Sequence, residues 1–418
     1  MSKLTGLVTM YRGLPRSIYV LFFARIINSL GSFVFPFLTM FLTDRLGLSE
    51  SRAGLYIMLS GVSYIPGSII GGKLADHLGR KKVLIISQFL GALCFVPCAF
   101  LGDSIYIPFF IIAADFFYGA VHPAIQAIAT DLSVPENRKE VFSLLYLGLN
   151  LGFALGPLIA GFLYTHYIRW IFLGDTLTTW LSLILILLFV DESRPTEQEI
   201  LKRVDDGTGE AAETGGFLRA LATRPFLLSF VFIIMILNFV YAQMSFTLPL
   251  FTIDLFSDRG PVLYGSLMSF NAVVVILGTS PIIASTRRMT AAQAVITAGV
   301  LYALGFGMLY LVSTPFPMFL SAFIWTIGEI LAATNTNVYI ANHTPISHRG
   351  RFNALFPIIM GIGHSMSPAL MGPVVETLGS RMIWPIMFFL AAFGTAALIV
   401  MNILERKKKR AHGQRPVV

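Results

Sequence analysis

The stretch Gly71-Gly-Lys-Leu-Ala-Asp-His-Leu-Gly-Arg-Lys-Lys82 is a short, charged, glycine-containing turn between two long apolar runs. The chain is apolar over roughly residues 52–74 before this turn and over roughly residues 83–101 after it. Each run has about the 20 residues that an α-helix needs to cross a hydrocarbon core of about 30 Å. The stretch therefore predicts two membrane-spanning helices joined by a basic hairpin.

The composition extends this prediction to the whole chain. Of the 418 residues, 56% are hydrophobic and only 12% are charged, whereas a soluble protein of this size carries about 25% charged residues. The net charge of +8 comes from Lys and Arg residues that lie between apolar runs, which argues against a nucleic-acid-binding surface. We predict an all-α polytopic membrane protein that contacts the lipid bilayer and binds no nucleic acid.

The apolar runs predict twelve transmembrane helices. They cover roughly residues 17–42, 52–74, 83–101, 105–131, 139–164, 169–191, 224–253, 262–284, 292–313, 315–342, 352–376 and 381–404. The segment between the sixth and seventh runs mixes both signs of charge and cannot span lipid. We expect an N-terminal six-helix bundle (1–191), a cytoplasmic linker (192–223), a C-terminal six-helix bundle (224–404) and a basic cytoplasmic tail (405–418).

Two further features concern topology. With both termini placed in the cytoplasm, the inside segments hold 24 Lys and Arg residues and the outside loops hold five, which is a strong positive-inside pattern. Short matches between the halves, such as residues 135–142 with 345–352, indicate an internal repeat. Repeated six-helix halves are typical of transporters whose substrate site lies at the midplane. We expect a multi-pass protein of the cell membrane with cytoplasmic termini.

The residues of the hairpin follow the pattern Gly-x-Leu-Ala-Asp-x-x-Gly-Arg-Lys. The matching positions are Gly72, Leu74, Asp76, Gly79, Arg80 and Lys81. This pattern resembles the cytoplasmic hairpin of the major facilitator superfamily, and the resemblance implies a conformational latch that holds one half against the other. The two glycines suit such a hairpin, because Gly72 permits close helix approach and Gly79 permits a tight turn.

The fifth predicted helix carries Gly148, Gly152 and Gly156 on one face, followed by Pro157. Such a face permits close helix packing, and the proline interrupts the hydrogen-bond ladder and permits a bend. The run resembles the superfamily's antiporter motif, which is associated with proton-coupled exporters. A tight helix contact in any transporter is the alternative interpretation. The resemblance implies that a proton gradient drives transport, without a cofactor or a metal.

Charged residues inside the predicted helices are candidates for function, because they are costly in lipid. At ~1.5 Å per residue, Asp115 lies about 15 Å into the fourth helix, and Arg25 lies at a comparable depth in the first. These two residues can form a pair that either fixes helix register or relays protons. Glu329 lies about 20 Å into the tenth helix, where it could couple proton movement to a conformational change or attract a cationic substrate.

The segments around Asp131 and Glu329 resemble the drug/proton antiporters of the superfamily, in which matching carboxylates handle protons and cationic drugs. Two interpretations apply to Asp131, because it ends its helix on the side of the hairpin. It is either a site of proton coupling or the partner of Arg80 in the latch.

Other polar and aromatic residues of the predicted helices are candidates to bind substrate. With Arg25 and Glu329 they are Asn28, Tyr118, His122, Asn238, Gln243 and Trp325. We predict a monomeric, proton-coupled exporter of small amphiphilic, cationic drugs that works by alternating access. Glu329 is its main protonatable site, and Asp115 and Asp131 are secondary sites.

The alternative function is a carrier for a single metabolite, sugar or lipid with the same fold. An intramembrane enzyme is disfavoured, because the sequence contains neither a His-Glu-x-x-His nor a Gly-x-Ser-x-Gly motif.

Overall fold

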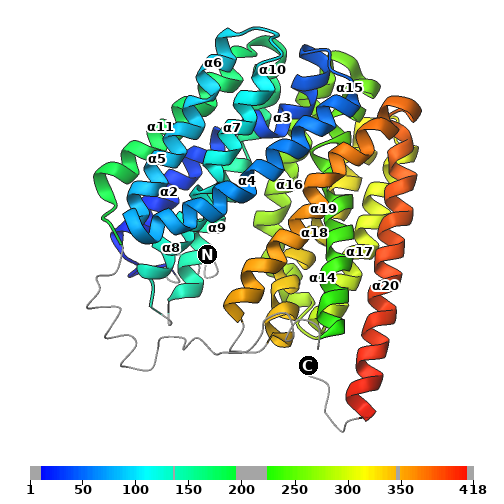
Figure 1. Ribbon diagram of the computed structural model, residues 1–418. Coiled ribbons are helices and arrows are strands. Elements are labelled where there is room, and N and C mark those ends of the chain that lie inside the picture. The colour runs from blue at the N-terminus through cyan, green and yellow to red at the C-terminus, as the bar shows by residue number, and fades with distance from the viewer. Residues whose placement is uncertain (1–10, 135–136, 194–223, 345–348, 412–418) are drawn as a thin grey trace, which may run out of the picture. The chain divides into compact units, whose positions relative to one another are not determined.

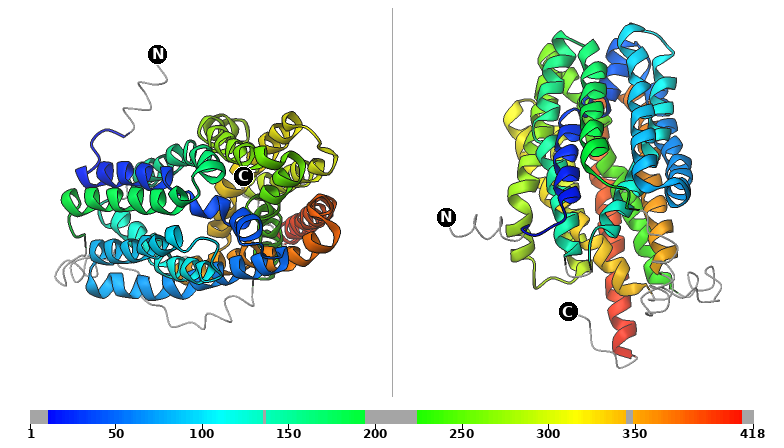
Figure 2. Two further views of the ribbon diagram at one scale, coloured as in Figure 1. Left: turned by 90° about the horizontal axis from the view of Figure 1, so that it is seen from above. Right: turned by 90° about the vertical axis from the view of Figure 1, so that its left-hand side faces the viewer.

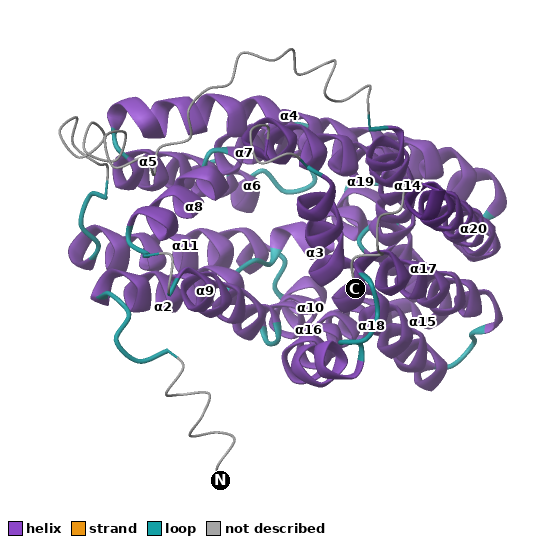
Figure 3. Cartoon of the chain, turned by 90° about the horizontal axis from the view of Figure 1, so that it is seen from below, coloured by secondary structure: helices purple, strands orange, loops and turns teal. Residues whose placement is uncertain are grey.

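The computed structural model describes residues 11–134, 137–193, 224–344 and 349–411. Regular structure in these ranges is helical, and they contain no strand (Figure 3). Eleven of their stretches are long and apolar enough to cross a membrane. One of these, Pro225–Ser285, has 61 residues, far more than the ~20 that one crossing needs, and it contains two long helical segments. The predicted all-α polytopic architecture is confirmed.

The helices of the first half of the chain carry the labels α2 to α11 in Figure 1. Their bounds are α2 (Arg16–Leu30), α3 (Val34–Met40), η1 (Phe41–Arg45), α4 (Glu50–Leu78), α5 (Arg80–Leu93), α6 (Phe95–Phe100), α7 (Ile107–Gly119), α8 (Val121–Asp131), α9 (Arg138–Phe153), α10 (Gly156–His166) and α11 (Arg169–Phe189).

The second half contains fewer interruptions. Its elements are α14 (Pro225–Tyr241), η2 (Ala242–Met244), α15 (Thr247–Phe256), η3 (Ser257–Arg259), α16 (Gly260–Ser285), α17 (Ala291–Met308), η4 (Leu309–Leu311), α18 (Pro315–His343), α19 (Arg349–Leu378), η6 (Ser380–Met382) and α20 (Ile383–Ala411).

Prolines explain why several crossings of the first half consist of two helices. A proline has no N–H to donate, and its ring clashes with the carbonyl four residues earlier. Helices α5, α7 and α9 each end at the residue four positions before a proline, namely Pro97, Pro123 and Pro157. The expected bend beside Pro157 is therefore present as a break between α9 and α10.

The first crossing is broken between α2 and α3, and a carboxylate from the sixth crossing stabilises the break. Asp175 of α11 accepts hydrogen bonds from the backbone N–H groups of Phe33 (3.1 Å) and Val34 (3.3 Å). These N–H groups have no partner within the helix, because they begin α3. Gly31 lies at the break, where an added Cβ would overlap the side chain of Thr178. Asp175 is not among the residues predicted from the sequence.

Residue contacts divide the chain into two compact units. Unit 1 comprises Met1–Leu48, Tyr56–Lys202 and Phe256–Ile276, and unit 2 comprises Ser49–Leu55, Arg203–Leu255 and Leu277–Val418. Helices α4 and α16 therefore contribute residues to both units. The predicted halves, 1–191 and 224–404, stay a prediction. Of the predicted linker, residues 194–223 lie outside the described residues.

Each unit has its own helix contacts. In unit 1, α2 packs against α9 and α11, and α5 packs against α7, α8 and α11; these helices are coloured blue to green in the left view of Figure 2. In unit 2, α17 packs against α18 and α20, and α14 packs against α19 and α20.

Helix α20, red in the right view of Figure 2, continues to Ala411 and so corrects the predicted helix end at residue 404. Glu405 explains the extension, because it is 6% exposed and has partners on α18. Its carboxylate accepts a hydrogen bond from the Tyr339 hydroxyl (2.9 Å) and pairs with His343 Nε2 (2.7 Å). The segment predicted as a tail, 405–418, therefore begins inside a packed helix.

Candidate functional site

The predicted hairpin joins α4 to α5 through a single residue. Gly79 has φ +106°, a backbone conformation that residues with a Cβ rarely adopt. An added Cβ would also lie 2.5 Å from Oε2 of Glu192. Both observations explain the glycine at this position.

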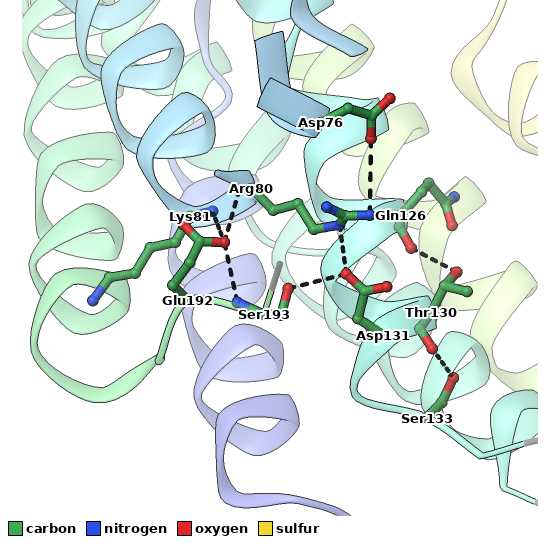
Figure 4. Close-up of polar contacts among 9 residues, drawn as sticks. All are labelled: Asp76, Arg80, Lys81, Gln126, Thr130, Asp131, Ser133, Glu192 and Ser193. Carbon is green, nitrogen blue, oxygen red and sulfur yellow. Dashed lines mark hydrogen bonds and ion pairs between the residues drawn. The ribbon is translucent and has the colours of Figure 1, made fainter. Parts of the chain in front are cut away.

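Arg80 begins α5 and lies between two carboxylates (Figure 4). Its Nε forms an ion pair with Asp131 at the end of α8, and its Nη2 lies 3.8 Å from Asp76 of α4. The Arg80 and Asp131 side chains are 13% and 11% exposed, whereas that of Asp76 is 70% exposed. Asp131 is therefore the desolvated partner, and the geometry matches the second of its two predicted interpretations.

Glu192, predicted from the sequence only as the first residue of the linker, completes the hairpin. Its carboxylate accepts hydrogen bonds from the backbone N–H groups of Arg80 (2.8 Å) and Lys81 (3.2 Å). A carboxylate at this position satisfies the free N–H groups at the start of α5 and favours the positive end of the helix dipole. The next residue, Ser193, donates its hydroxyl to Asp131 at 3.3 Å (Figure 4). The two residues that follow α11 thus hydrogen-bond to both partners of the ion pair: Glu192 to the backbone of Arg80, and Ser193 to the carboxylate of Asp131.

The close approach expected at Gly72 occurs at other glycines. A Cβ on Gly72 would meet only Pro123, at the ordinary contact distance of 3.9 Å. Added Cβ atoms on Gly67 and Gly71 would lie 1.9 Å from the Phe116 carbonyl oxygen and 2.1 Å from the Ala120 Cβ. The prediction for Gly72 was wrong, because Gly67 and Gly71 make the close contacts of α4, with Phe116 and Ala120.

The glycines of the antiporter-like motif all face α2. Added Cβ atoms would lie 3.0 Å from Phe22 at Gly148, 2.5 Å from the Ile26 carbonyl oxygen at Gly152, and 2.7 Å from the Leu30 carbonyl oxygen at Gly156. Helices α9 and α10 can therefore lie directly on the α2 backbone only because these positions lack side chains.

The predicted Arg25–Asp115 pair is not formed in the described residues. Asp115 of α7 instead accepts a hydrogen bond from the Ser60 hydroxyl of α4. Arg25 of α2 forms no ion pair with another described residue, and it interacts electrostatically with Tyr64 of α4 and His122 of α8. These residues lie in unit 1.

Asn28 and Tyr118 also belong to unit 1. Asn28 donates a hydrogen bond to the Thr179 hydroxyl of α11 at 3.0 Å. The Tyr118 ring packs against Gly91 of α5, where an added Cβ would lie 2.9 Å away, and against Phe95. Both residues therefore contribute to packing between helices.

Three residues of unit 2 that were predicted to contact substrate make contacts with other residues of the protein. Asn238 donates to the Met360 carbonyl oxygen (3.1 Å), and Gln243, which is fully buried, donates to the Ser367 hydroxyl (2.5 Å). Trp325 is 1% exposed and stacks on Phe306, with ring centroids 5.7 Å apart. In this structure these residues contact neighbouring elements of unit 2, and their assignment as substrate contacts stays a prediction.

Glu329 is half-buried and lies between the buried residues Gly328 and Ile330 of α18. It interacts electrostatically with Tyr302 of α17. Asn335, further along α18, donates its amide to the Leu331 carbonyl oxygen and the Thr334 hydroxyl, both at 2.9 Å. Among the described residues, no group of three or more His, Cys, Asp or Glu side chains could hold a metal ion.

Known proteins resemble the chain over most of its length. It is 24% identical over 370 residues to the uncharacterized MFS-type transporter YhjO of Bacillus subtilis, covering 87% of each chain. It is 23% identical over 359 residues to the Na(+), Li(+), K(+)/H(+) antiporter of Planococcus maritimus, covering 80% of this chain and 84% of the relative. A shorter match, 30% identical over 149 residues, is to the quinolone resistance protein NorA of Staphylococcus aureus, covering 35% of this chain and 38% of NorA.

The fold is shared with solved transporters. A crystal structure of a POT family transporter in complex with a thioalcohol-conjugated peptide superposes with a TM-score of 0.73 at 16% identity, covering 95% of this chain and 99% of that one. Residues 21–368 match the sequence pattern of the family described as Major Facilitator Superfamily. The hairpin, the helical architecture and this match over most of the chain agree, and the chain belongs to the Major Facilitator Superfamily.

Proposed function

We propose that this protein is a proton-coupled exporter of small amphiphilic, cationic compounds that works by alternating access. Membership of the superfamily makes it a secondary transporter in the cell membrane. The resemblance to NorA, a quinolone resistance protein, and to a cation/proton antiporter supports export and proton exchange. The distribution of Lys and Arg supports cytoplasmic termini.

The observation that carries this proposal is the position of Glu329. It is an ionisable carboxylate within a 26-residue apolar stretch, Pro315–Ile340, and it remains half-buried. Carboxylates inside membrane-spanning helices are rare because they are costly, and they mark proton and substrate pathways. In the proposed cycle, the protonated Glu329 releases a cationic substrate and the ionised Glu329 binds one. Asp115 has a secondary role in coupling, and Asp131 acts through the Arg80 hairpin.

The test is efflux of ethidium from energised cells that produce the full-length chain, with and without a protonophore. We expect efflux by the wild type to stop when the protonophore is added. Glu329→Gln should lower efflux at least tenfold, since the amide cannot exchange a proton. Asp103→Asn is the matched control, because Asp103 is an exposed carboxylate in the loop before α7 and should leave efflux unchanged. Efflux that survives both the protonophore and Glu329→Gln would exclude this mechanism.

A second candidate, exchange of alkali cations for protons, follows from the Planococcus relative and from a pair of carboxylates. Asp115 of α7 and Asp175 of α11 both lie in unit 1, and carboxylates are suitable ligands for hard cations. The assay is a Na⁺ or K⁺ pulse to proteoliposomes that contain a pH-sensitive dye. Proton release on the pulse, lost in Asp115→Asn, would favour this candidate over drug export.

A further inference from the structure

His343, the last residue of α18, forms a close pair with Glu405 of α20. Its Nε2 lies 2.7 Å from Oε1 of the carboxylate, and its Nδ1 lies 2.8 Å from the carbonyl oxygen of Tyr339, one turn earlier on α18. The other carboxylate oxygen accepts a hydrogen bond of 2.9 Å from the Tyr339 hydroxyl. Both nitrogens of the imidazole therefore lie at hydrogen-bond distance from an oxygen atom.

These contacts require one proton that His343 and Glu405 share. The carbonyl oxygen of Tyr339 can only accept a hydrogen bond, so Nδ1 carries a hydrogen. The contact between Nε2 and Oε1 needs a second hydrogen, which is bound either to the imidazole or to the carboxyl group. Without this second hydrogen the imidazole has a single N–H, and in either tautomer one of its nitrogens directs a lone pair at an oxygen atom.

The position of the pair makes this proton important for the contact between the helices. Glu405 is buried, and His343 is half-buried. A buried carboxylate is costly unless it is paired and hydrogen-bonded. Loss of the shared proton therefore weakens the contact by which the end of α20 is bound to α18.

Two neighbouring cations keep their charge where histidine titrates. Arg224, directly before α14, donates a hydrogen bond from Nη1 to the carbonyl oxygen of His343 at 2.5 Å. Lys408 of α20 lies over the Phe226 ring of α14, with Nζ 5.7 Å from the ring centroid. Arg, Lys and Tyr side chains ordinarily titrate at about pH 10 or above, whereas histidine ordinarily titrates between about pH 5 and 8. In this group of residues, the pH response near neutrality therefore comes from the pair itself.

We infer that His343 and Glu405 form a proton-binding site whose proton holds the end of α20 against α18, and that loss of this proton releases the helix end. The site is separate from Glu329, because Glu329 lies inside the apolar stretch Pro315–Ile340 and His343 follows that stretch. The distribution of Lys and Arg predicts that both helices end in the cytoplasm. The site therefore responds to cytoplasmic pH, whatever compound the protein transports.

The test is hydrogen–deuterium exchange of the purified full-length protein in detergent, measured by mass spectrometry at about pH 6 and about pH 9, on either side of neutrality. Protection factors correct for the effect of pH on the chemical exchange rate. We expect the protection of residues 400–411 to fall at least tenfold from the lower to the higher pH, which is the effect of losing one hydrogen bond to a charged group. The protection of α17 should stay constant.

Two variants keep the contact and remove the shared proton. In His343→Gln the new amide donates to Glu405, and in Glu405→Gln the new amide donates to a neutral His343. We expect no fall in the protection of residues 400–411 with rising pH in either variant. His166→Gln is the matched control, because His166 is an exposed histidine at the end of α10 in unit 1 and should show the wild-type fall.

Equal protection of residues 400–411 at both pH values in the wild type would overturn the inference. A fall of wild-type size in both variants would overturn it as well. The wild-type measurement needs no substitution, so it decides the question even when a variant does not fold. No transport is measured, and a fall in protection therefore stands if proton-coupled efflux is disproved.

Discussion

The Arg80–Asp131 pair allows a quantitative prediction, because Arg80 contacts two carboxylates in very different surroundings. Asp131 is 11% exposed and forms a close ion pair, whereas Asp76 is 70% exposed and lies 3.8 Å away. Removing one partner of a buried pair leaves a charge uncompensated and costs about 3–5 kcal/mol. An exposed pair contributes about 0–1 kcal/mol. We expect Asp131→Asn to lower the free energy of unfolding by about 3 kcal/mol and Asp76→Asn by less than about 1 kcal/mol.

The assay is thermal unfolding of the purified protein in detergent, followed by tryptophan fluorescence. A loss of about 3 kcal/mol corresponds to a fall in Tm of roughly 6–12 °C for a cooperatively unfolding unit of about 150–250 residues. The double variant with Arg80→Gln should be less destabilised than the sum of the single variants, with a coupling energy of about 2 kcal/mol. Equal losses for Asp131→Asn and Asp76→Asn, or strict additivity in the double variant, would refute the reasoning.

Three further predictions use the same unfolding measurement. Gly79→Ala should cost about 1–2 kcal/mol and more than Gly47→Ala, because both glycines have positive φ but a Cβ at Gly47 meets nothing within 4 Å; a larger loss at Gly47 would contradict this. Gly152→Ala should cost about 1–3 kcal/mol, because its Cβ would lie 2.5 Å from a carbonyl oxygen of α2, while Gly361→Ala, in open space, should be tolerated. Glu405→Ala should cost about 2–3 kcal/mol, because it leaves a buried hydroxyl and an imidazole without their acceptor, and unchanged stability would show that these bonds are not formed.

The hairpin shows which structural features can be predicted from residues that are adjacent in the sequence. The turn at Gly79 and the start of α5 follow from residues that are adjacent in the chain, because one glycine with positive φ is enough to join two helices. Glu192 could not be identified in the same way. It lies more than 100 residues from Arg80, and a polar residue after an apolar run is equally consistent with an unbound linker. The carboxylate of Glu192 reaches the start of α5 only because α11 packs beside α5.

For the candidate substrate residues, the sequence does not predict what each side chain contacts. Asn238, Gln243 and Trp325 are polar or aromatic residues in apolar runs, and composition alone cannot distinguish a cavity from an interhelix bond. In the structure, the two amides bond to α19, and the indole stacks in the core of unit 2. The depth of each residue could be counted along its helix, but the direction in which it points depends on which helix lies opposite.

The sequence by itself determined the membrane-spanning helical class, the approximate helix bounds and the hairpin, since these depend on hydrophobic length and on backbone freedom within a few residues. Tertiary structure decided the pairing of charges. Asp115 accepts a hydrogen bond from Ser60, Asp131 pairs with Arg80, and Arg25 forms no ion pair with another described residue. The reason is physical, because an ion pair needs its atoms within about 4 Å, and in a bundle of helices that distance is set by rotation and crossing of segments far apart in the chain.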